Sequence, residues 1–183
     1  MALILEDGSC VPAANALVAR AALIAYAADY APTTTVADDT ATDSAILRAS
    51  AWLSSFPQWD GTMSCGRGLQ GLAWPRTGVT DCNSDPVPVD EVPVEVEQAT
   101  FIASLAELAV PGVLTPTITP GEQVKRVKVD VIEQEFMTPL QQGKKSAADP
   151  VETLRPVLTA INDLLKCMAT LPDGTAMPWP WVA

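Results

Sequence analysis

The chain has 183 residues, of which 48% are apolar and only 5% aromatic, and its formal net charge is −11. This length and apolar content are enough for a buried core, which excludes a chain that is disordered throughout. The sequence contains no histidine, so Ser-His-Asp and Cys-His catalysis and the usual zinc sites are excluded.

The chain is expected to be mainly α-helical, because alanine is abundant and aromatic residues are few. A first helix is predicted over residues 15–30, with Asn15 as its N-terminal cap. Its apolar face is predicted to comprise Leu17, Ala21, Ile24 and Ala28. A second helix is predicted over residues 41–56, with Thr40 in its N-terminal cap and Pro57 at its end.

Residues 57–90 form a long segment rich in Gly, Pro, Asp, Asn and Ser, which predicts a packed loop. It contains the sequence GLQGLAWPRTGV at residues 68–79. Trp74 precedes Pro75 and is therefore expected to be extended and available for packing, while Arg76 can bond carbonyls or a neighbour's carboxylate. We expect Trp74, Pro75 and Arg76 to hold the shape of this loop; the alternative is a direct contact between subunits.

A third helix is predicted over residues 91–110, capped by Asp90, and because it is apolar on most sides it should be the central helix of the core. A linker rich in Pro, Thr and Gly follows. Residues 124–136 then alternate between valines and charged residues, and the alternation changes phase near Asp130. This pattern predicts a two-stranded ribbon with a bulge or tight turn, which needs a partner surface on its own helices or on a neighbouring chain.

A last helix is predicted to begin at Pro150 or Pro156 and to end at Met168. The proline-rich tail beyond it carries Trp179 and Trp181, which should either dock on another subunit or fold back. The expected organisation is therefore a small helical bundle with a long loop and an extended arm. Its divisions are a core over residues 1–110, a linker and ribbon arm over 111–149, and a C-terminal helix and tail over 150–183.

Charge is distributed unevenly along the chain. Residues 1–124 contain 15 acidic and 4 basic residues, whereas residues 125–183 contain 7 of each. Basic residues cluster only at Lys125, Arg126 and Lys128 and at Lys144 and Lys145. Because phosphate neutralisation supplies most non-specific affinity for DNA, a protein that is acidic overall is not expected to hold DNA tightly.

The cysteines and the start of the chain lead to two further expectations. The cysteines show no CxxC spacing and are expected to be reduced thiols; they are Cys10, Cys65, Cys82 and Cys167. The acidic start and the absence of an apolar run of about 20 residues predict synthesis in the cytoplasm, with no signal peptide and no membrane contact.

Several blocks of sequence, in this order, resemble a known family. They are ALILEDG at residues 2–8, ANALV at 14–18, LAWPRTGV at 72–79 and VPVEVEQATFIASLAELA at 92–109. Together with the ribbon and the last helix, over residues 2–168, they resemble the phage family labelled DnaT-like single-stranded DNA binding. That family is also similar to the head-tail adaptor, or connector, proteins of long-tailed phages. The chain departs from the pattern in the loop TMSCGRGLQG, at Asp130 and in its Trp-Pro-Trp tail.

The resemblance implies a structural virion protein. The residues themselves offer no catalytic constellation, so no enzyme activity, cofactor or metal is expected. It would form a ring, expected to be a dodecamer, in the neck of the virion, between the portal protein and a tail-proximal neck or terminator protein. Genomic DNA would pass through it without tight binding. The expected contact residues are Lys125, Arg126, Lys128, Val129, Val131, Phe136, Trp179 and Trp181. The alternative is a single-stranded-DNA-binding accessory protein that uses the three basic residues and stacking by tryptophans.

Overall fold

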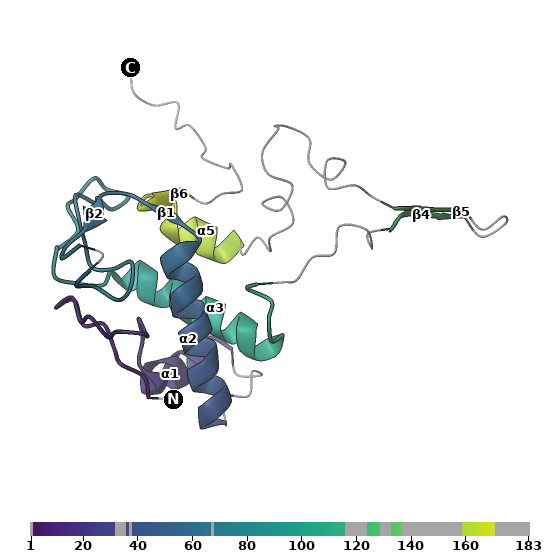
Figure 1. The fold of residues 1–183 in the computed structure, drawn as a ribbon, viewed down its shortest axis with the longest axis horizontal. Coiled ribbons are helices and arrows are strands. Elements are labelled where there is room, and N and C mark those ends of the chain that lie inside the picture. The colour runs from purple at the N-terminus through teal and green to yellow at the C-terminus, as the bar shows by residue number, and fades with distance from the viewer. Residues whose placement is uncertain are drawn as a thin grey trace, which may run out of the picture. The chain divides into compact units, whose positions relative to one another are not determined.

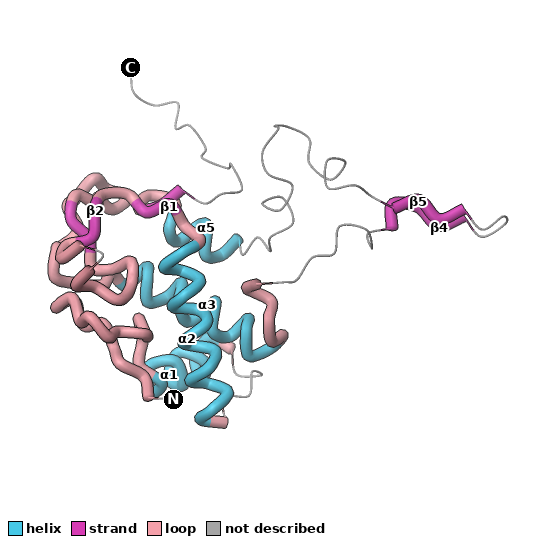
Figure 2. The backbone as a smooth tube through the Cα atoms, in the orientation of Figure 1, coloured by secondary structure: helices cyan, strands magenta, loops and turns pink. Residues whose placement is uncertain are grey.

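The computed structural model describes residues 2–31, 36, 38–66, 68–115, 124–128, 133–136 and 159–170. The chain divides into two compact units, one formed by residues 1–114 and 157–183 and the other by residues 115–156. The described residues form four helices and three two-stranded antiparallel sheets (Figures 1 and 2). The mainly α-helical fold with a β-ribbon is thus confirmed.

Helix α3 (Val94–Ala109) is the centre of the first unit. It contacts α1 (Arg20–Tyr30), α2 (Asp39–Ser55) and α5 (Thr159–Leu165), and in Figure 1 α2 crosses it. Its Val96, Ala99 and Ala103 are completely buried. Small side chains let the neighbouring helices approach closely, and burying this apolar surface supplies the main driving force for folding. The prediction of a central third helix is confirmed, although it begins after Pro93 and is not capped by Asp90.

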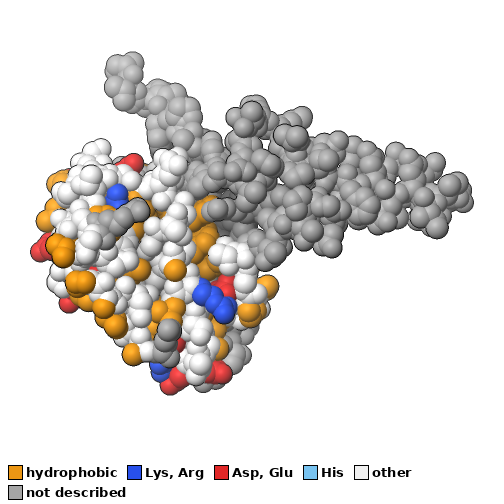
Figure 3. Space-filling view, viewed as in Figure 1, with side chains coloured by type: hydrophobic (Ala, Val, Ile, Leu, Met, Phe, Trp, Pro, Cys, Tyr) orange, Lys and Arg blue, Asp and Glu red, His pale blue; other side chains and the backbone are white. Residues whose placement is uncertain are grey.

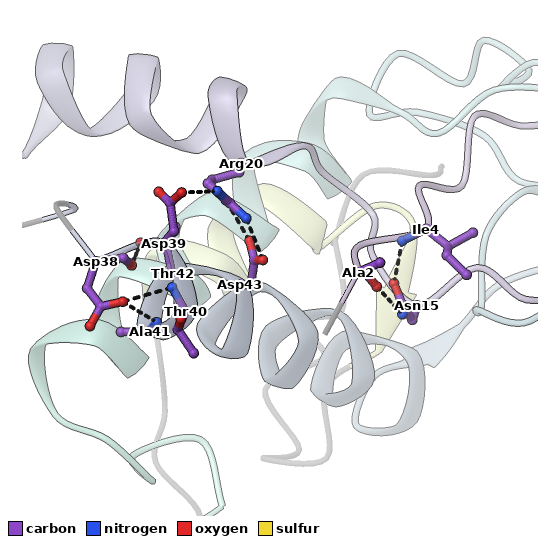
Figure 4. A network of polar contacts seen from close by, with 10 residues as sticks. All are labelled: Ala2, Ile4, Asn15, Arg20, Asp38, Asp39, Thr40, Ala41, Thr42 and Asp43. Atoms are coloured by element: carbon purple, nitrogen blue, oxygen red, sulfur yellow. Dashed lines mark hydrogen bonds and ion pairs between the residues drawn. The ribbon is translucent and has the colours of Figure 1, made fainter.

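Helix α1 begins five residues later than predicted, because Asn15 has another role. The Asn15 Oδ1 atom accepts a hydrogen bond from the backbone N–H of Ile4 at 2.8 Å, and its amide donates to the carbonyl of Ala2 at 3.2 Å (Figure 4). These bonds hold residues 14–18 against the N-terminal segment. The helix therefore buries Leu23 and Ala27, whereas Ile24, on the predicted apolar face, is 42% exposed.

Charged residues join the start of α1 to the first turns of α2. Arg20 donates hydrogen bonds to both carboxylate oxygens of Asp43, at 2.7 and 2.6 Å, and also pairs with Asp39 (Figure 4). The hydrogen bond from Arg20 lowers the pKa of Asp43. Asp38, not Thr40, caps α2, since its Oδ1 accepts from the backbone N–H of Thr40 at 2.8 Å.

Two short sheets close the long loop of the first unit. Strand β1 (Gln58–Trp59) pairs with β6 (Ala169–Thr170), which follows α5 in the chain. Strand β2 (Thr62–Met63) pairs with β3 (Arg76–Thr77) within the loop. The loop is therefore fastened at one end to the segment that follows the last helix.

The second unit contains the predicted ribbon, made of β4 (Val124–Lys128) and β5 (Glu133–Phe136). The register sets Arg126 opposite Glu135 and Lys128 opposite Glu133. The register is irregular between Val124 and Arg126. The bulge or tight turn predicted near Asp130 falls on residues outside the described ones and stays a prediction. Val129, Val131, Trp179 and Trp181 are also outside the described residues.

A buried carboxylate closes the C-terminal end of α3. Glu107 is 2% exposed; it accepts hydrogen bonds from the backbone N–H groups of Gly112 and Leu114 and from Arg48, which donates at 2.7 Å. Burial alone would raise the pKa of Glu107, but the three donors together lower it from its ordinary value of 4.5. The ionised form of Glu107 is therefore part of the folded state.

We predict that Glu107→Gln lowers the free energy of unfolding at pH 7 by about 2–3 kcal/mol. The substitution removes the ion pair with Arg48, and the new amide NH₂ group faces N–H donors where the carboxylate accepted from them. Because the folded-state pKa is below 4.5, the ionised carboxylate stabilises the fold fully above that pH, and this contribution disappears as the pH falls through the folded-state pKa. Urea unfolding between pH 2 and pH 7 measures both effects. Glu95→Gln on the same helix is the matched control, and equal stability of the two variants would contradict the role of Glu107.

Candidate functional site

Trp74 lies in the core at the centre of the predicted loop motif. Its side chain is completely buried, the peptide bond to Pro75 is cis, and its ring meets that of Trp59 edge to face with centroids 5.4 Å apart. The indole N–H of Trp74 has no hydrogen-bond acceptor among the described residues. A large aromatic side chain at this position holds the loop to the helices through apolar burial.

Arg76 uses its guanidinium group inside its own loop. Nε donates to the carbonyl of Asp60 at 2.8 Å, Nη2 to that of Gly61 at 2.9 Å and Nη1 to that of Ala73 at 3.1 Å. Burial lowers the pKa of Arg76, and the nearby Asp60 carboxylate opposes this shift. Of the two partners weighed for Arg76 above, its own backbone carbonyls are the ones it bonds.

Sequence reasoning missed the contribution of the residues just before Trp74. The Gln70 amide is buried and donates to the carbonyls of Leu72 and Pro75 at 3.0 and 2.9 Å. A Cβ atom at Gly71 would lie 2.5 Å from the carbonyl oxygen of Ala14, so only glycine allows the loop to pack this closely on the N-terminal segment. No local sequence pattern predicts the role of Gln70 or of Gly71, because both roles depend on the folded arrangement of the loop and its neighbours.

The four cysteines form two disulfides, so the expectation of reduced thiols is wrong for this structure. Cys10 pairs with Cys65 across 55 residues, and Cys82 pairs with Cys167 across 85 residues. The two Cα–Cα distances are 6.1 and 5.1 Å, within the range that a disulfide requires. Partners so distant in the sequence give no spacing signal, because only the fold brings them together. Both bonds fasten the loop of residues 57–90.

The basic residues of the first unit are mostly used internally. The described part of this unit contains 15 acidic and 4 basic residues. Arg20 and Arg48 pair with carboxylates and Arg76 bonds carbonyls, whereas Lys166 is exposed. On the face drawn in Figure 3, the basic groups of the described residues are isolated and form no stripe. This surface offers little attraction to phosphate.

A cavity of about 390 Å³ lies between the N-terminal segment, α1 and α3. Its apolar wall includes Leu17, Val18, Ala22 and Phe101, and its acidic residues are Glu6, Asp7, Glu91 and Glu97. The Glu6 carboxylate is already satisfied by the backbone N–H groups of Gly8, Cys10 and Val11. Sequence analysis did not find this cavity, because three separate segments form it.

Glu97 differs from the other acidic residues of the cavity. It is half-buried, and its carboxylate has no hydrogen-bond or ion-pair partner among the described residues. Burial raises its pKa. The cavity therefore combines an apolar wall with a carboxylate that lacks a counter-ion, which is an environment suited to a basic side chain with an aliphatic stem.

Two other classes of site are not found in the part of the chain that the structure describes. Within those residues, no three Cys, Asp or Glu side chains lie close enough together to bind a metal ion. No helix there has the length and apolar character needed to cross a membrane.

Comparison with protein families gives a match over most of the chain. A family model described as "Putative DnaT-like ssDNA binding protein" matches residues 1–177. Searches of curated proteins and of solved structures found no match.

We predict that the unreduced protein contains no free thiol and that reduction exposes four. Breaking both disulfides should lower stability substantially, because each typically contributes about 2–4 kcal/mol by restricting the unfolded chain. Thiol titration under denaturing conditions, with and without reductant, measures the pairing, and thermal unfolding measures the stability. The double variants Cys10→Ser/Cys65→Ser and Cys82→Ser/Cys167→Ser separate the two bonds, and four free thiols before reduction would contradict the pairing.

Proposed function

The chain belongs to the family of DnaT-like single-stranded-DNA-binding proteins, and from this premise we propose that it is a non-catalytic protein that binds single-stranded DNA through residues 115–156. The observation that carries the proposal is the location of the basic residues. Of the 11 in the chain, six lie in this unit, namely Lys125, Arg126, Lys128, Lys144, Lys145 and Arg155. Lysine and arginine side chains bind DNA phosphates, and neutralising the phosphate charge supplies most of the affinity of proteins for single strands.

The first unit, residues 1–114 and 157–183, is poorly suited to binding DNA, which supports placing the DNA-binding site in the second unit. Its described arginines are committed to carboxylates and backbone carbonyls, and its acidic residues outnumber its basic ones. A phosphate backbone would be repelled by that surface at low ionic strength. Any attraction to DNA must therefore come from the other unit, in which acidic and basic residues are equal in number.

We predict salt-dependent binding of a labelled oligothymidine that is weakened by the triple substitution Lys125→Gln/Arg126→Gln/Lys128→Gln. For single strands the slope of log K against log salt is about −0.7 per neutralised phosphate, so the variant should lose about two units of slope. Fluorescence anisotropy of the full chain between 25 and about 200 mM salt measures this. Lys166→Gln in the first unit is the control and should change the slope little. Absence of binding at the lowest salt would contradict the proposal.

Exposed apolar residues of the first unit favour a second candidate function. Ile4, Leu5, Val89 and Val94 are between 40% and 62% exposed. Leu5 lines the cavity together with Glu91, and Val89 and Val94 lie within three residues of Glu91 in the chain. Exposed apolar side chains next to acidic residues can take part in a contact between proteins when they form one patch. A contact between proteins is what a structural role as the head-tail adaptor of a long-tailed phage requires.

In this second proposal the chain forms a dodecameric ring in the virion neck. It contacts the portal protein and a tail-proximal neck or terminator protein, using the ribbon residues and the Trp179 and Trp181 tail. An acidic inner wall would let genomic DNA slide without being held. This role needs no tight binding of single-stranded DNA, so the two proposals are distinguishable.

The adaptor role predicts that purified virions contain this protein in a ratio to portal protein near one. Quantitative mass spectrometry of virions, with the major capsid protein as the internal standard, measures that ratio. Absence from virions, with the protein present in infected cells, would reject the adaptor role and leave DNA binding as the function.

A further inference from the structure

We propose that the cavity beside α3 binds the Lys125 side chain from the ribbon of a second copy of this chain. The Glu97 carboxylate would pair with the lysine ammonium, and the apolar wall would cover its aliphatic stem. This contact concerns the assembly of the protein with itself and needs no DNA, but it competes with DNA for Lys125, which the proposed function assigns to phosphate.

The cavity has room for a long basic side chain and the chemistry to bind it. At about 390 Å³ it exceeds the volume of a lysine side chain, and Leu17, Val18 and Ala22 provide an apolar surface along its wall. The Phe101 ring also lines it, and an ammonium group near an aromatic face gains a further attraction. Lysine buries its methylene stem readily while its charged end finds a partner.

Glu97 supplies a reason for the cavity to accept a cation. A half-buried carboxylate is costly unless it is paired, and no partner for Glu97 exists among the described residues. Asp7 and Glu91 add negative charge to the same cavity. An incoming ammonium group would remove the cost of the unpaired carboxylate, so the pair should form more strongly than one on an open surface.

The ribbon provides the complementary group. The register places Arg126 opposite Glu135 and Lys128 opposite Glu133, but it assigns no opposite residue to Lys125, which lies at the irregularity between Val124 and Arg126. Lys125 is therefore the basic residue of β4 that has no acidic residue across from it. Val124 precedes Lys125 and Val127 lies two residues after it, so apolar residues accompany the lysine, as the exposed Leu5 accompanies the cavity. Complementary charge and apolar character together identify the ribbon as the occupant.

The test is self-association of the full-length protein, measured by sedimentation velocity over a wide concentration range at low salt. We expect association that weakens with salt. Lys125→Glu and Glu97→Lys should each weaken it by about tenfold or more, because each leaves like charges facing one another. The double variant Lys125→Glu/Glu97→Lys should restore it. Lys144→Glu and Glu95→Lys, which make the same charge changes at other positions, should have a much smaller effect.

Several results would overturn the proposal. These are a protein that stays monomeric at every concentration, association unaffected by Glu97→Lys, and a double variant no better than the single ones. Glu97→Gln, which preserves shape, should weaken association with unchanged helix content and guards against misfolding of Glu97→Lys. DNA binding gives an independent readout, because Glu97→Lys should leave oligothymidine affinity unchanged or raised. Loss of self-association with intact DNA binding therefore tests this contact alone.

Discussion

The arrangement of the first unit depends on the burial of α3 by small side chains. Thr100 and Ser104 are completely buried, yet their hydroxyls donate at 2.7 Å to the carbonyls of Val96 and Thr100, one turn earlier in the same helix. Their polar groups are thus satisfied without help from neighbouring elements. With Ala99 and Ala103, they leave helix faces narrow enough for α2 and α5 to pack closely.

The polar groups of α3 that interact with other parts of the unit lie toward its two ends. The first half contributes Glu97 and Phe101 to the cavity, and the C-terminal end holds the Arg48–Glu107 pair. That pair, like the Arg20–Asp43 pair, uses an arginine to neutralise a carboxylate inside the fold. The positive charges of these two arginines are therefore used in ion pairs that stabilise the unit. Most of the other charged residues of the unit are acidic.

The sequence predicted the parts of the fold that depend on periodicity. The central helix and the alternation of residues 124–136 were recognisable because their apolar residues recur at regular spacing. The prediction that the first helix begins at Asn15 was wrong, because the Asn15 side chain bonds to the N-terminal segment and not to a helix end. The disulfides and the cavity were not predicted, because each joins segments that only the tertiary structure brings together. Burial of Trp74 followed from its position before Pro75, whereas the cis peptide bond did not.

The Cys82–Cys167 bond has a topological consequence for the unit of residues 115–156. Both crossings between the two units fall between these cysteines in the sequence, so the bond closes a covalent ring through which the chain leaves the first unit and returns. A single cut in the second unit would therefore not release α5 or the segment beyond it. The same closure makes insertions in the second unit thermodynamically mild, since loop entropy grows only slowly with length. The second unit is thus free to vary in length while the helices keep one arrangement.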